Sequence, residues 1–533
     1  MIIDQIPFEK IRFFSSFLSD YILEKDSLRY LYNHFPTLTN FKKQIDEKQN
    51  HFSQEARNLL VKAIKEQYFG TRTSTKVLEN IELLGKKNTF TITTGHQLSL
   101  FTGHLYFIYK IISVINTTKI LSEKYPDYQF VPIYWMATED HDFEEINHFH
   151  LHKKTLHWSS SQTGMTGNFN TETLDQVFHL FEKNIGLGKN ANTLKQLFKS
   201  SYLENNNLAS ATRFLVNALF EHYGVVVVDG NHHGLKKSFA PYMKNDLLQH
   251  TAYQEVSKSI QQIQQIDKTY PIQVNPREIN LFYLTKNGRN RIITSKDRFQ
   301  VHQTDITFSQ SEILNELAHY PERFSPNVIM RPLYQEVILP NLAYIGGGGE
   351  IAYWLELKRF FDTEQIPFPI LMLRNSAILI SENQLNKIKK LQLSTEDLFL
   401  NNNDLKNKKI RQLSDFPIDF SQQKATLQKQ FADLYQIAEQ TDVSFKNAVK
   451  AQEIKQLKGL EKLEKRLLKA QKRKFAEQLA RIDYLQDELF PHGSLQERFS
   501  NFSEFYLEQG DNFISNLVED FNPFDFRFLL LKY

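Results

Sequence analysis

Four ionisable residues in a row, at positions 139–142, stand directly after an apolar run. The run, residues 130–136, is typical of a strand buried on both faces of a parallel sheet, so the four residues fall at its carboxyl end. Open α/β sheets bind ligands at that edge. Carboxylates there can hold an ammonium group, sugar hydroxyls or Mg²⁺, and an imidazole can transfer a proton. We therefore predict substrate binding by Glu139 and Asp142, and catalytic roles for Asp140 and His141.

A second candidate is the loop at residues 95–103, between a predicted strand at 89–94 and a predicted helix at 104–121. Free N–H groups and the positive end of a helix favour phosphate at such a turn, which suits nucleotide activation. An ordinary strand-to-helix turn is the structural alternative. From this loop we predict catalytic roles for His96 and Gln97, and nucleotide binding by Gly95, Thr102, Gly103 and His104.

Residues 325–350 form a third candidate, in which an arginine precedes four successive glycines. A guanidinium can make paired hydrogen bonds to a carboxylate or phosphate, and the glycines let a ligand approach the backbone where a helix begins. The stretch matches neither G-x-G-x-x-G nor the Walker pattern, which disfavours a dinucleotide fold or a P-loop kinase. We predict substrate binding by Asn327, Arg331 and Gln335, and by Asp229 after the apolar run 225–228. We predict nucleotide binding by Gly346, Gly347, Gly348, Gly349 and Glu350.

The predicted secondary structure brings these segments to one sheet edge. Apolar strands are expected at residues 89–94, 130–136, 225–230, 337–345 and 368–373. Separated by helices and glycine-containing turns, they predict an α/β fold with a doubly wound parallel sheet. We predict this core, with N-terminal helices, over residues 1–380, and insertions at about 150–222 and 250–325. The second insertion contains strand-like pieces at 278–284 and 291–294 around an Asn287–Gly288 turn signal.

The composition changes after residue 381 to Lys, Gln, Glu and Leu. Apolar residues recur at three- and four-residue steps from Ile454 to Leu489, which favours a coiled coil against which residues 422–440 pack antiparallel. We predict a helical coiled-coil domain over 381–520 that forms a homodimer. An aromatic tail, 521–533, is expected to return to the core, because many exposed Phe side chains would be costly.

The overall composition narrows the function classes. The 533 residues include no cysteine, which excludes disulfides, thiolate nucleophiles and cysteine-ligated zinc. A net charge of +3 does not favour a nucleic-acid surface, and the basic residues between 462 and 474 are expected to be a solvated helix face. No apolar run approaches the ~18 residues of a membrane span, so we expect no membrane partner and a cytoplasmic location.

Two other function classes stay open on the residues alone. One is a metal-dependent hydrolase, for example a deacetylase, that uses His96, Asp140, His141 and His148. The other is a non-catalytic scaffold that binds nucleotide and recruits partners through the coiled coil. His148, His150 and His152 alternate as on one strand face, which can be solvated or can ligate a metal.

Four motifs, in order along the chain, resemble the BshC family of bacillithiol biosynthesis. They are T-G-H-Q-x-x-L-F-T-G-x-L-Y at 94–106, W-M-A-T-E-D-H-D-F-E-E-I-N at 135–147, S-P-N-V-x-x-R-P-x-x-Q-E at 325–336 and I-G-G-G-G-E-I-A-Y-W at 345–354. The resemblance implies a Rossmann-like core similar to class I aminoacyl-tRNA synthetases, with connecting-peptide insertions and a coiled coil that supports dimerisation. It also implies the addition of L-cysteine to glucosaminyl-malate as the last step of bacillithiol biosynthesis.

The same resemblance guides the expected cosubstrates. ATP with Mg²⁺ is expected to activate the cysteine carboxyl group, and no zinc is expected. Phe101–His104 occupies the place of the synthetase H-x-G-H motif, but Phe101 replaces its first histidine. This departure moves the predicted catalytic role to His96, Gln97 and the backbone of Gly95 and Gly103.

Overall fold

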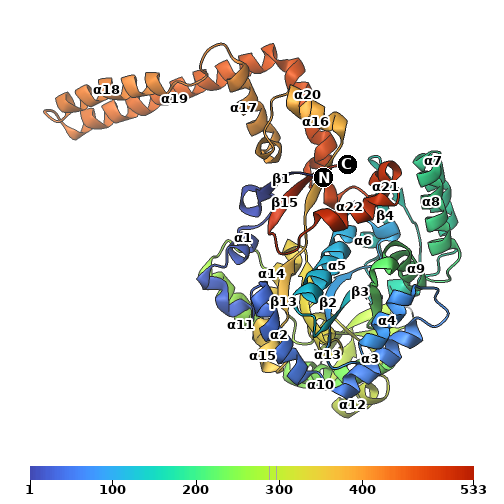
Figure 1. Ribbon diagram of the computed structural model, residues 1–533. Coiled ribbons are helices and arrows are strands. Elements are labelled where there is room, and N and C mark those ends of the chain that lie inside the picture. Colours follow the sequence, from blue (N-terminus) through green and yellow to red (C-terminus); the bar gives the residue numbers. More distant parts are fainter. Residues whose placement is uncertain (287, 296) are drawn as a thin grey trace. The chain divides into compact units, whose positions relative to one another are not determined.

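The protein is described from a computed structural model, which describes residues 1–286, 288–295 and 297–533 (Figure 1). The predicted turn residue Asn287 lies outside these residues. The chain divides into two compact units: unit 1 contains residues 1–379 and 494–533, and unit 2 contains residues 380–493. Across the described ranges, no helix combines the length and the apolar character that a membrane span requires.

A five-stranded parallel sheet forms the centre of unit 1. Its strands are β2 (Thr89–His96), β3 (Gln129–Met136), β6 (Val226–Asp229), β12 (Asn341–Gly346) and β13 (Ile370–Leu373), in the order β13-β12-β2-β3-β6. Numbered along the chain, this is the order 3-2-1-4-5 of a Rossmann-like sheet, whose direction reverses between its first and fourth strands. The predicted α/β fold is confirmed, and the switch point lies between β2 and β12.

Helices pack on the central sheet and bury its apolar side chains. The helices that contact its strands are α2 (Leu38–His51), α3 (Gln54–Gln67), α4 (Thr75–Leu83), α5 (Tyr106–Lys124), α9 (Leu208–Phe220) and α14 (Gly348–Leu355). The core between them includes Phe41, Ile92, Val114 and Ile345, each almost fully buried. Helices α3 and α4 begin as capping predicts, because the hydroxyls of Ser53 and Ser74 accept hydrogen bonds from Ala56 N and Val77 N.

The predicted strand at residues 337–345 is wrong in its first part. Helix α13 (Met330–Ile338) continues through Ile338, and β12 begins only at Asn341. The run around Val337 is apolar because this helix is buried, and a short apolar run alone does not separate a buried helix from a buried strand. Pro340, which has no N–H group, lies between the two elements.

Insertions between the strands carry smaller sheets. The first contains the hairpin β4 (His148–Leu151) and β5 (Lys154–His157), followed by α7 (Leu174–Ile185) and α8 (Lys189–Phe198). After α10 (His233–Gln249) and α11 (Thr251–Ile266), a second sheet has the order β10-β9-β8-β7-β11. Its strands are β7 (Leu281–Thr285), β8 (Gly288–Ser295), β9 (Arg298–Val301), β10 (Thr307–Phe308) and β11 (Phe324–Pro326).

The two ends of the chain meet in a third sheet. Strand β15 (Arg527–Lys532) lies between β1 (Ile2–Pro7) and β14 (Ala377–Ile380), and pairs antiparallel with β1. The aromatic tail therefore packs as a buried strand. Helices α21 (Phe502–Gln509) and α22 (Asn512–Asp520), which we had predicted as part of the helical domain, belong to unit 1. Their side chains Phe502 and Phe513 are fully buried there, which accounts for the difference.

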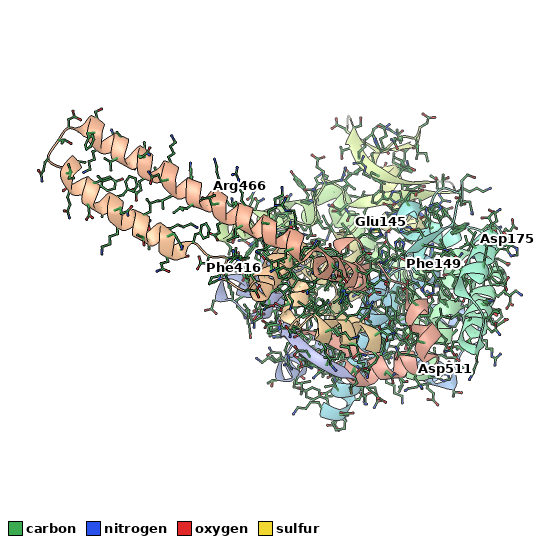
Figure 2. All side chains as sticks on the ribbon, turned by 90° about the horizontal axis from the view of Figure 1, so that it is seen from above. Glu145, Phe149, Asp175, Phe416, Arg466 and Asp511 are labelled. Carbon is green, nitrogen blue, oxygen red and sulfur yellow. The ribbon has the colours of Figure 1, made fainter. Side chains whose placement is uncertain are left out.

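Unit 2 is helical, with α16 (Glu382–Lys390), α17 (Asn402–Leu413), α18 (Ser421–Ala438), α19 (Val443–Lys474) and α20 (Ala476–Leu489). Helices α18 and α19 form an antiparallel hairpin (Figure 1). Side chains such as Arg466 project outward from it (Figure 2). A small apolar cluster of Phe431, Ala438 and Val449 joins them. The apolar residues that we predicted to recur from Ile454 to Leu489 are divided between two helices, because α19 ends at Lys474 and α20 begins at Ala476.

Candidate active site

The carboxyl ends of β2, β3 and β12 surround a cavity of about 830 Å³. Parallel pairing sets Gly95 beside Trp135 and His96 beside Met136, so two of the predicted motifs meet at this edge. The predicted site residues that line the cavity are Gly95, His96, Gln97, Glu139, Asp140, Asn327, Arg331, Gly347, Gly349 and Glu350. Those that do not line it are Thr102, Gly103, His104, His141, Asp142, Asp229, Gln335, Gly346 and Gly348.

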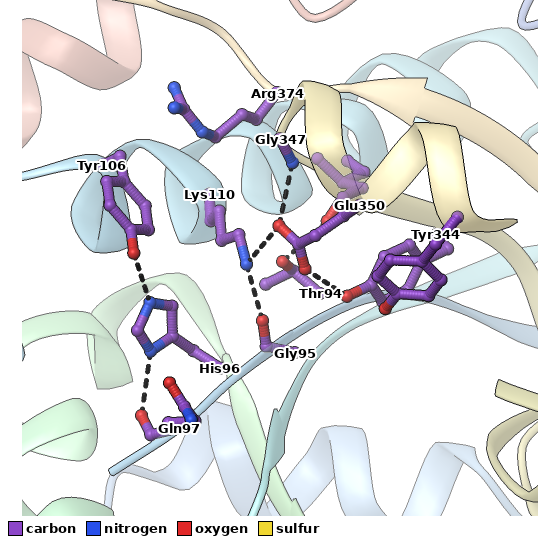
Figure 3. Close-up of polar contacts among 12 residues, drawn as sticks. Thr94, Gly95, His96, Gln97, Tyr106, Lys110, Tyr344, Gly347, Glu350 and Arg374 are labelled. Atoms are coloured by element: carbon purple, nitrogen blue, oxygen red, sulfur yellow. Dashed lines mark hydrogen bonds and ion pairs between the residues drawn. The ribbon is translucent and has the colours of Figure 1, made fainter. Parts of the chain in front are cut away.

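An ion pair bridges the switch point (Figure 3). Lys110 Nζ lies 2.6 Å from Glu350 Oε2 and donates to the Gly95 carbonyl at 2.8 Å. Glu350 also accepts from Tyr344 OH at 2.7 Å and from Gly347 N at 2.9 Å. Although burial raises the pKa of Glu350, these partners lower it to about 2. The carboxylate of Glu350 therefore occupies part of the helix N-terminus where we had predicted phosphate.

The imidazole of His96 is held from both sides (Figure 3). Its Nδ1 lies 2.9 Å from the Gln97 carbonyl and its Nε2 lies 3.3 Å from Tyr106 OH. Because a carbonyl only accepts, Nδ1 carries the proton and Nε2 accepts from the tyrosine. Burial and the nearby charge of Lys110 lower the pKa of His96 to about 3, so the ring is neutral at pH 7. His96 is therefore placed to orient Tyr106, which also lines the cavity.

The end of β3 forms an acidic wall. Gln97 Nε2 donates to Asp140 Oδ2 and to Glu145 Oε2, both at 2.7 Å. Burial alone would raise the pKa of Asp140. Hydrogen bonds from His141 and Gln97 and the charge of Arg289 have a larger, opposite effect, so the pKa of this carboxyl group lies well below its usual range. Asp140 is therefore a carboxylate at neutral pH. His141 lies beside this wall, with Nδ1 at 3.2 Å from Arg289 Nη1.

Two other acidic residues at this edge already have protein partners. Glu139 forms an ion pair with the buried Lys236 of α10 and accepts from Ser325 Oγ at 3.2 Å. Asp229 accepts from Thr138 Oγ1 at 2.6 Å and from Asn231 N at 2.8 Å, and burial raises its pKa. Glu139 still lines the cavity, whereas Asp229 supports the wall from outside it.

The third motif supplies a guanidinium group. Arg331, on α13, donates from Nη1 to Gln335 Oε1 at 3.1 Å and from Nη2 to Tyr353 OH at 3.2 Å. Gln335 is fully buried beneath the wall, so it contacts Arg331 and not the cavity. Asn327 Oδ1 accepts from Ile329 N and Met330 N, which fixes the start of α13.

The loop before α5 is braced away from the cavity. Phe101, Thr102 and Gly103 have positive φ values of 48°, 68° and 61°. Asn501 Nδ2 donates to the carbonyls of Phe101 and Gly103, at 2.8 and 2.7 Å. Thr102 is fully buried, and His104 lies near His148 and His150. The segment Phe101–His104, which resembles H-x-G-H, therefore forms a constrained turn that does not line the cavity.

Several lining residues escaped the sequence analysis: Tyr106, Lys110, Arg277, Arg289, Arg374 and Arg498. A lysine on the otherwise apolar face of the predicted helix 104–121 was a usable signal for Lys110. Arg374 pairs with the buried Glu497 at 2.7 Å, and Arg498 follows in the next position. Nothing near Arg498 in the sequence indicates a site, because only folding brings this segment to the sheet.

The four residues of the hydrolase alternative do not form a metal-binding group. Among the described residues, no three His, Asp or Glu side chains are arranged to hold a metal ion. His148 contacts His104 and His150, on the insertion side of the constrained turn.

A five-stranded sheet of this order, with a polar cavity at its switch point, defines a Rossmann-like ligand-binding protein. Residues 1–375 match the N-terminal Rossmann-like domain of the bacillithiol biosynthesis family BshC, and residues 377–533 match its C-terminal coiled-coil domain. The chain therefore belongs to the BshC family.

Relatives match over nearly the whole length. A protein of Flavobacterium johnsoniae is 53% identical over 99% of both chains, and one of Christiangramia forsetii is 51% identical over 99% of this chain and 98% of its own. A protein of Bacillus thuringiensis strain Al Hakam is 28% identical, over 94% of this chain and 95% of its own. All three bear the provisional name cysteine ligase BshC.

Among the solved structures that match is a protein of Campylobacter jejuni provisionally named as an arginyl-tRNA synthetase. It is 11% identical and has a TM-score of 0.21, covering 83% of this chain and 93% of its own. The strand order and the family match establish the fold.

Proposed function

We propose that the protein is a ligase that joins the carboxyl group of L-cysteine to the amine of glucosaminyl-malate in the last step of bacillithiol biosynthesis. Its family belongs to bacillithiol biosynthesis, and its relatives bear the name of cysteine ligases. Together these support a carbon–nitrogen bond-forming enzyme with two small substrates.

The observation that carries the proposal is that carboxylates and guanidinium groups line the same cavity. Asp140 and Glu145 stand on the β3 wall, whereas Arg331, Arg374 and Arg498 come from the side of β12 and the C-terminal segment. A carboxylate wall suits the ammonium group of cysteine and the sugar hydroxyls, and guanidinium groups suit carboxylates or phosphates. We infer that both substrates lie between these walls, near Tyr106.

We propose ATP, bound with Mg²⁺, as the activating cosubstrate. The carboxylate oxygen of cysteine attacks the α-phosphorus, and pyrophosphate leaves with the electron pair of the broken P–O bond. The amine of glucosaminyl-malate then attacks the acyl carbon, AMP leaves, and the amine loses one proton as the amide forms. Because Glu350 occupies the N-terminus of α14, the guanidinium groups are the better candidates to stabilise phosphate charge.

The activity can be tested directly on the purified chain. We expect cysteine, glucosaminyl-malate and ATP to give bacillithiol, with AMP and pyrophosphate in equal amounts, as measured by mass spectrometry. Asp140→Asn should reduce kcat/KM by 10-fold or more, at about 1.4 kcal/mol per tenfold change. A deletion strain should accumulate glucosaminyl-malate. If that strain makes normal amounts of bacillithiol, the ligase proposal is wrong.

The scaffold alternative predicts a different result in cells. A strain carrying His96→Ala and Asp140→Asn together would still make bacillithiol if the protein only recruited partners. For a ligase, we expect this strain to resemble the deletion strain, provided that the variant accumulates to wild-type levels.

We also propose that unit 2 forms a homodimer through its helical hairpin. Ile454 and Leu463 on α19, and Leu434 and Ile437 on α18, are 41–55% exposed, which leaves apolar surface for a second copy. Sedimentation equilibrium should give a dimer for the wild type and a monomer for Leu463→Glu. A wild-type monomer at micromolar concentration would contradict the proposal.

A further inference from the structure

Within the described residues, the guanidinium of Arg331 is held by hydrogen bonds and forms no direct ion pair, although the charge of Glu350 acts on it from a distance. Its side-chain hydrogen bonds to Gln335 and Tyr353 go to neutral oxygens. In the described part of the chain, no ion pair joins Arg331 to a carboxylate, although it lines a cavity that has four acidic residues in its walls. A desolvated cation without a counter-charge is unfavourable unless a ligand supplies one.

The neighbouring carboxylates are held by other partners. Glu350 accepts from Lys110, Tyr344 and Gly347. Glu336, next to Gln335 in sequence, points into the core, where it accepts from Lys48 at 3.2 Å and from Asn341 at 2.7 Å. Gln335 Nε2 donates to Glu336 Oε1 at 3.0 Å, so the amide is oriented with its oxygen toward Arg331. The amide thus fixes the guanidinium without cancelling its charge.

The surroundings keep one side of Arg331 open. Its guanidinium lies over the rings of Trp135 and Tyr344, at 6.0 and 5.6 Å from their centres. A Cβ atom at Gly95 would lie 3.8 Å from Arg331 Nη1, and the glycine leaves that space free. A planar cation that is held in a cavity by neutral acceptors and aromatic rings is preorganised for one anionic group.

We propose that Arg331 forms a subsite for a single oxyanion of a ligand, a carboxylate or a phosphate, and that Gln335 is the positioning residue that aims it. The subsite is defined by its charge and geometry and does not depend on the ligation reaction proposed above. Gln335 acts through Arg331 and has no contact with the ligand. A Glu at position 335 would fill the same volume but would place the missing negative charge inside the protein.

Calorimetric titration of the full-length chain can test this subsite. Pyrophosphate serves as the phosphate probe and succinate as the carboxylate probe, each at low ionic strength because salt screens such contacts. We expect Arg331→Gln to weaken binding of at least one probe by roughly 10- to 100-fold, as for a lost charge-assisted hydrogen bond. The probe that responds identifies the source of the oxyanion.

Two further variants separate this role from a structural one. Arg57 is a control, because it lies over two phenylalanine rings and donates only to neutral acceptors, the carbonyls of Leu84, Lys87 and Thr89, although it is more deeply buried than Arg331. Arg57→Gln should lower the melting temperature without changing probe affinity in the folded protein. Gln335→Glu should weaken binding as much as Arg331→Gln, with Arg331 still present, and Gln335→Met should weaken it less.

Three results would overturn the proposal. They are that the wild type binds neither probe at millimolar concentration, that Arg331→Gln binds both as tightly as the wild type, or that Gln335→Glu binds both as tightly. None of them would decide whether the enzyme ligates cysteine, because no reaction takes place in the titration. Conversely, a wild type that binds a probe through Arg331 but forms no bacillithiol would refute only the ligase proposal.

Discussion

Lys110, which is buried, and Glu350, which is partly exposed, form an ion pair 2.6 Å long that joins α5, after the first strand of the central sheet, to α14, after the fourth. In a Rossmann-like sheet these two connections lie on opposite sides of the switch point, where the ligand crevice opens. Lys110 also donates to the Gly95 carbonyl, so one ammonium group joins the end of β2 to Glu350 on α14, on the other side of the cavity. The shape of the cavity therefore depends on this pair.

Removal of Lys110 should destabilise unit 1 strongly. Lys110→Met leaves the Glu350 carboxylate without its cation, and the free energy of unfolding should fall by about 3–5 kcal/mol. Because Trp135, Trp158 and Trp354 all belong to unit 1, denaturation followed by tryptophan fluorescence reports on this unit. Adding Glu350→Gln should restore part of the loss. Lys358→Met, which removes a surface pair with Asp362, should cost less than about 1 kcal/mol.

The neutral His96 should make stability depend on pH. The folded pKa is about 3, and the ordinary value is 6.5, so between these values the unfolded chain binds a proton that the folded chain does not. This residue's contribution is complete above pH 6.5 and declines as the pH falls toward 3, by about 1.4 kcal/mol per pH unit. The slope should be lower in His96→Gln when unfolding is measured from pH 4 to 7. Equal slopes would show that the ring titrates normally.

A methyl group at position 95 should leave the folded structure stable but should weaken ligand binding. A Cβ there would lie 3.5 Å from Tyr344 OH and 3.6 Å from Trp135 Cβ, which are ordinary contacts. We expect Gly95→Ala to change the free energy of unfolding by less than about 1 kcal/mol and to weaken pyrophosphate binding. Gly167→Ala is the contrast, since its Cβ would lie 2.7 Å from Thr138 Cβ. That overpacking should cost about 1–3 kcal/mol.

Glu497 should be essential for the wall that carries Arg374. It is fully buried and accepts from Arg374 Nη2 at 2.7 Å, and from Ser376 Oγ and Ala377 N at 3.2 Å. Glu497→Ala should lower the free energy of unfolding by about 3–5 kcal/mol. Glu497→Gln should cost less, because it keeps an acceptor. Glu82→Ala, which breaks an exposed pair with Lys65, should stay within about 1 kcal/mol.

The sequence alone predicted the central sheet because four of its strands contain apolar runs and β2 is rich in β-branched residues, each with a glycine or a charge near its end. Val226–Asp229 is the clearest case, with three valines followed by an acid. The error at Val337 arose because a buried helix and a buried strand have the same apolar composition over a few residues. The placement of α21 and α22 depends on long-range packing of their phenylalanines, which composition does not reveal.

The candidate site was only partly predictable for the same reason. Gly95, Asp140 and Glu350 were found because chemistry at strand ends follows directly from sheet topology. The partners that determine their behaviour come from elsewhere: Lys236 neutralises Glu139, and Asn501 closes the turn at Gly103. Local patterns place such side chains on an element but do not show which distant element they meet.

The central position of β15 in the sheet β1-β15-β14 has a consequence for synthesis in the cell. Domains usually fold from the N-terminus as the ribosome adds residues. Strand β1 precedes every other described element and its partner β15 follows them all, so β1 has no strand partner until those elements have been synthesised. Arg374, which lies just before β14, also lacks its ion-pair partner until late in synthesis, because Glu497 lies in the C-terminal part of the chain. The cavity is therefore completed only after Glu497, the partner of Arg374, and the lining residue Arg498 have been synthesised.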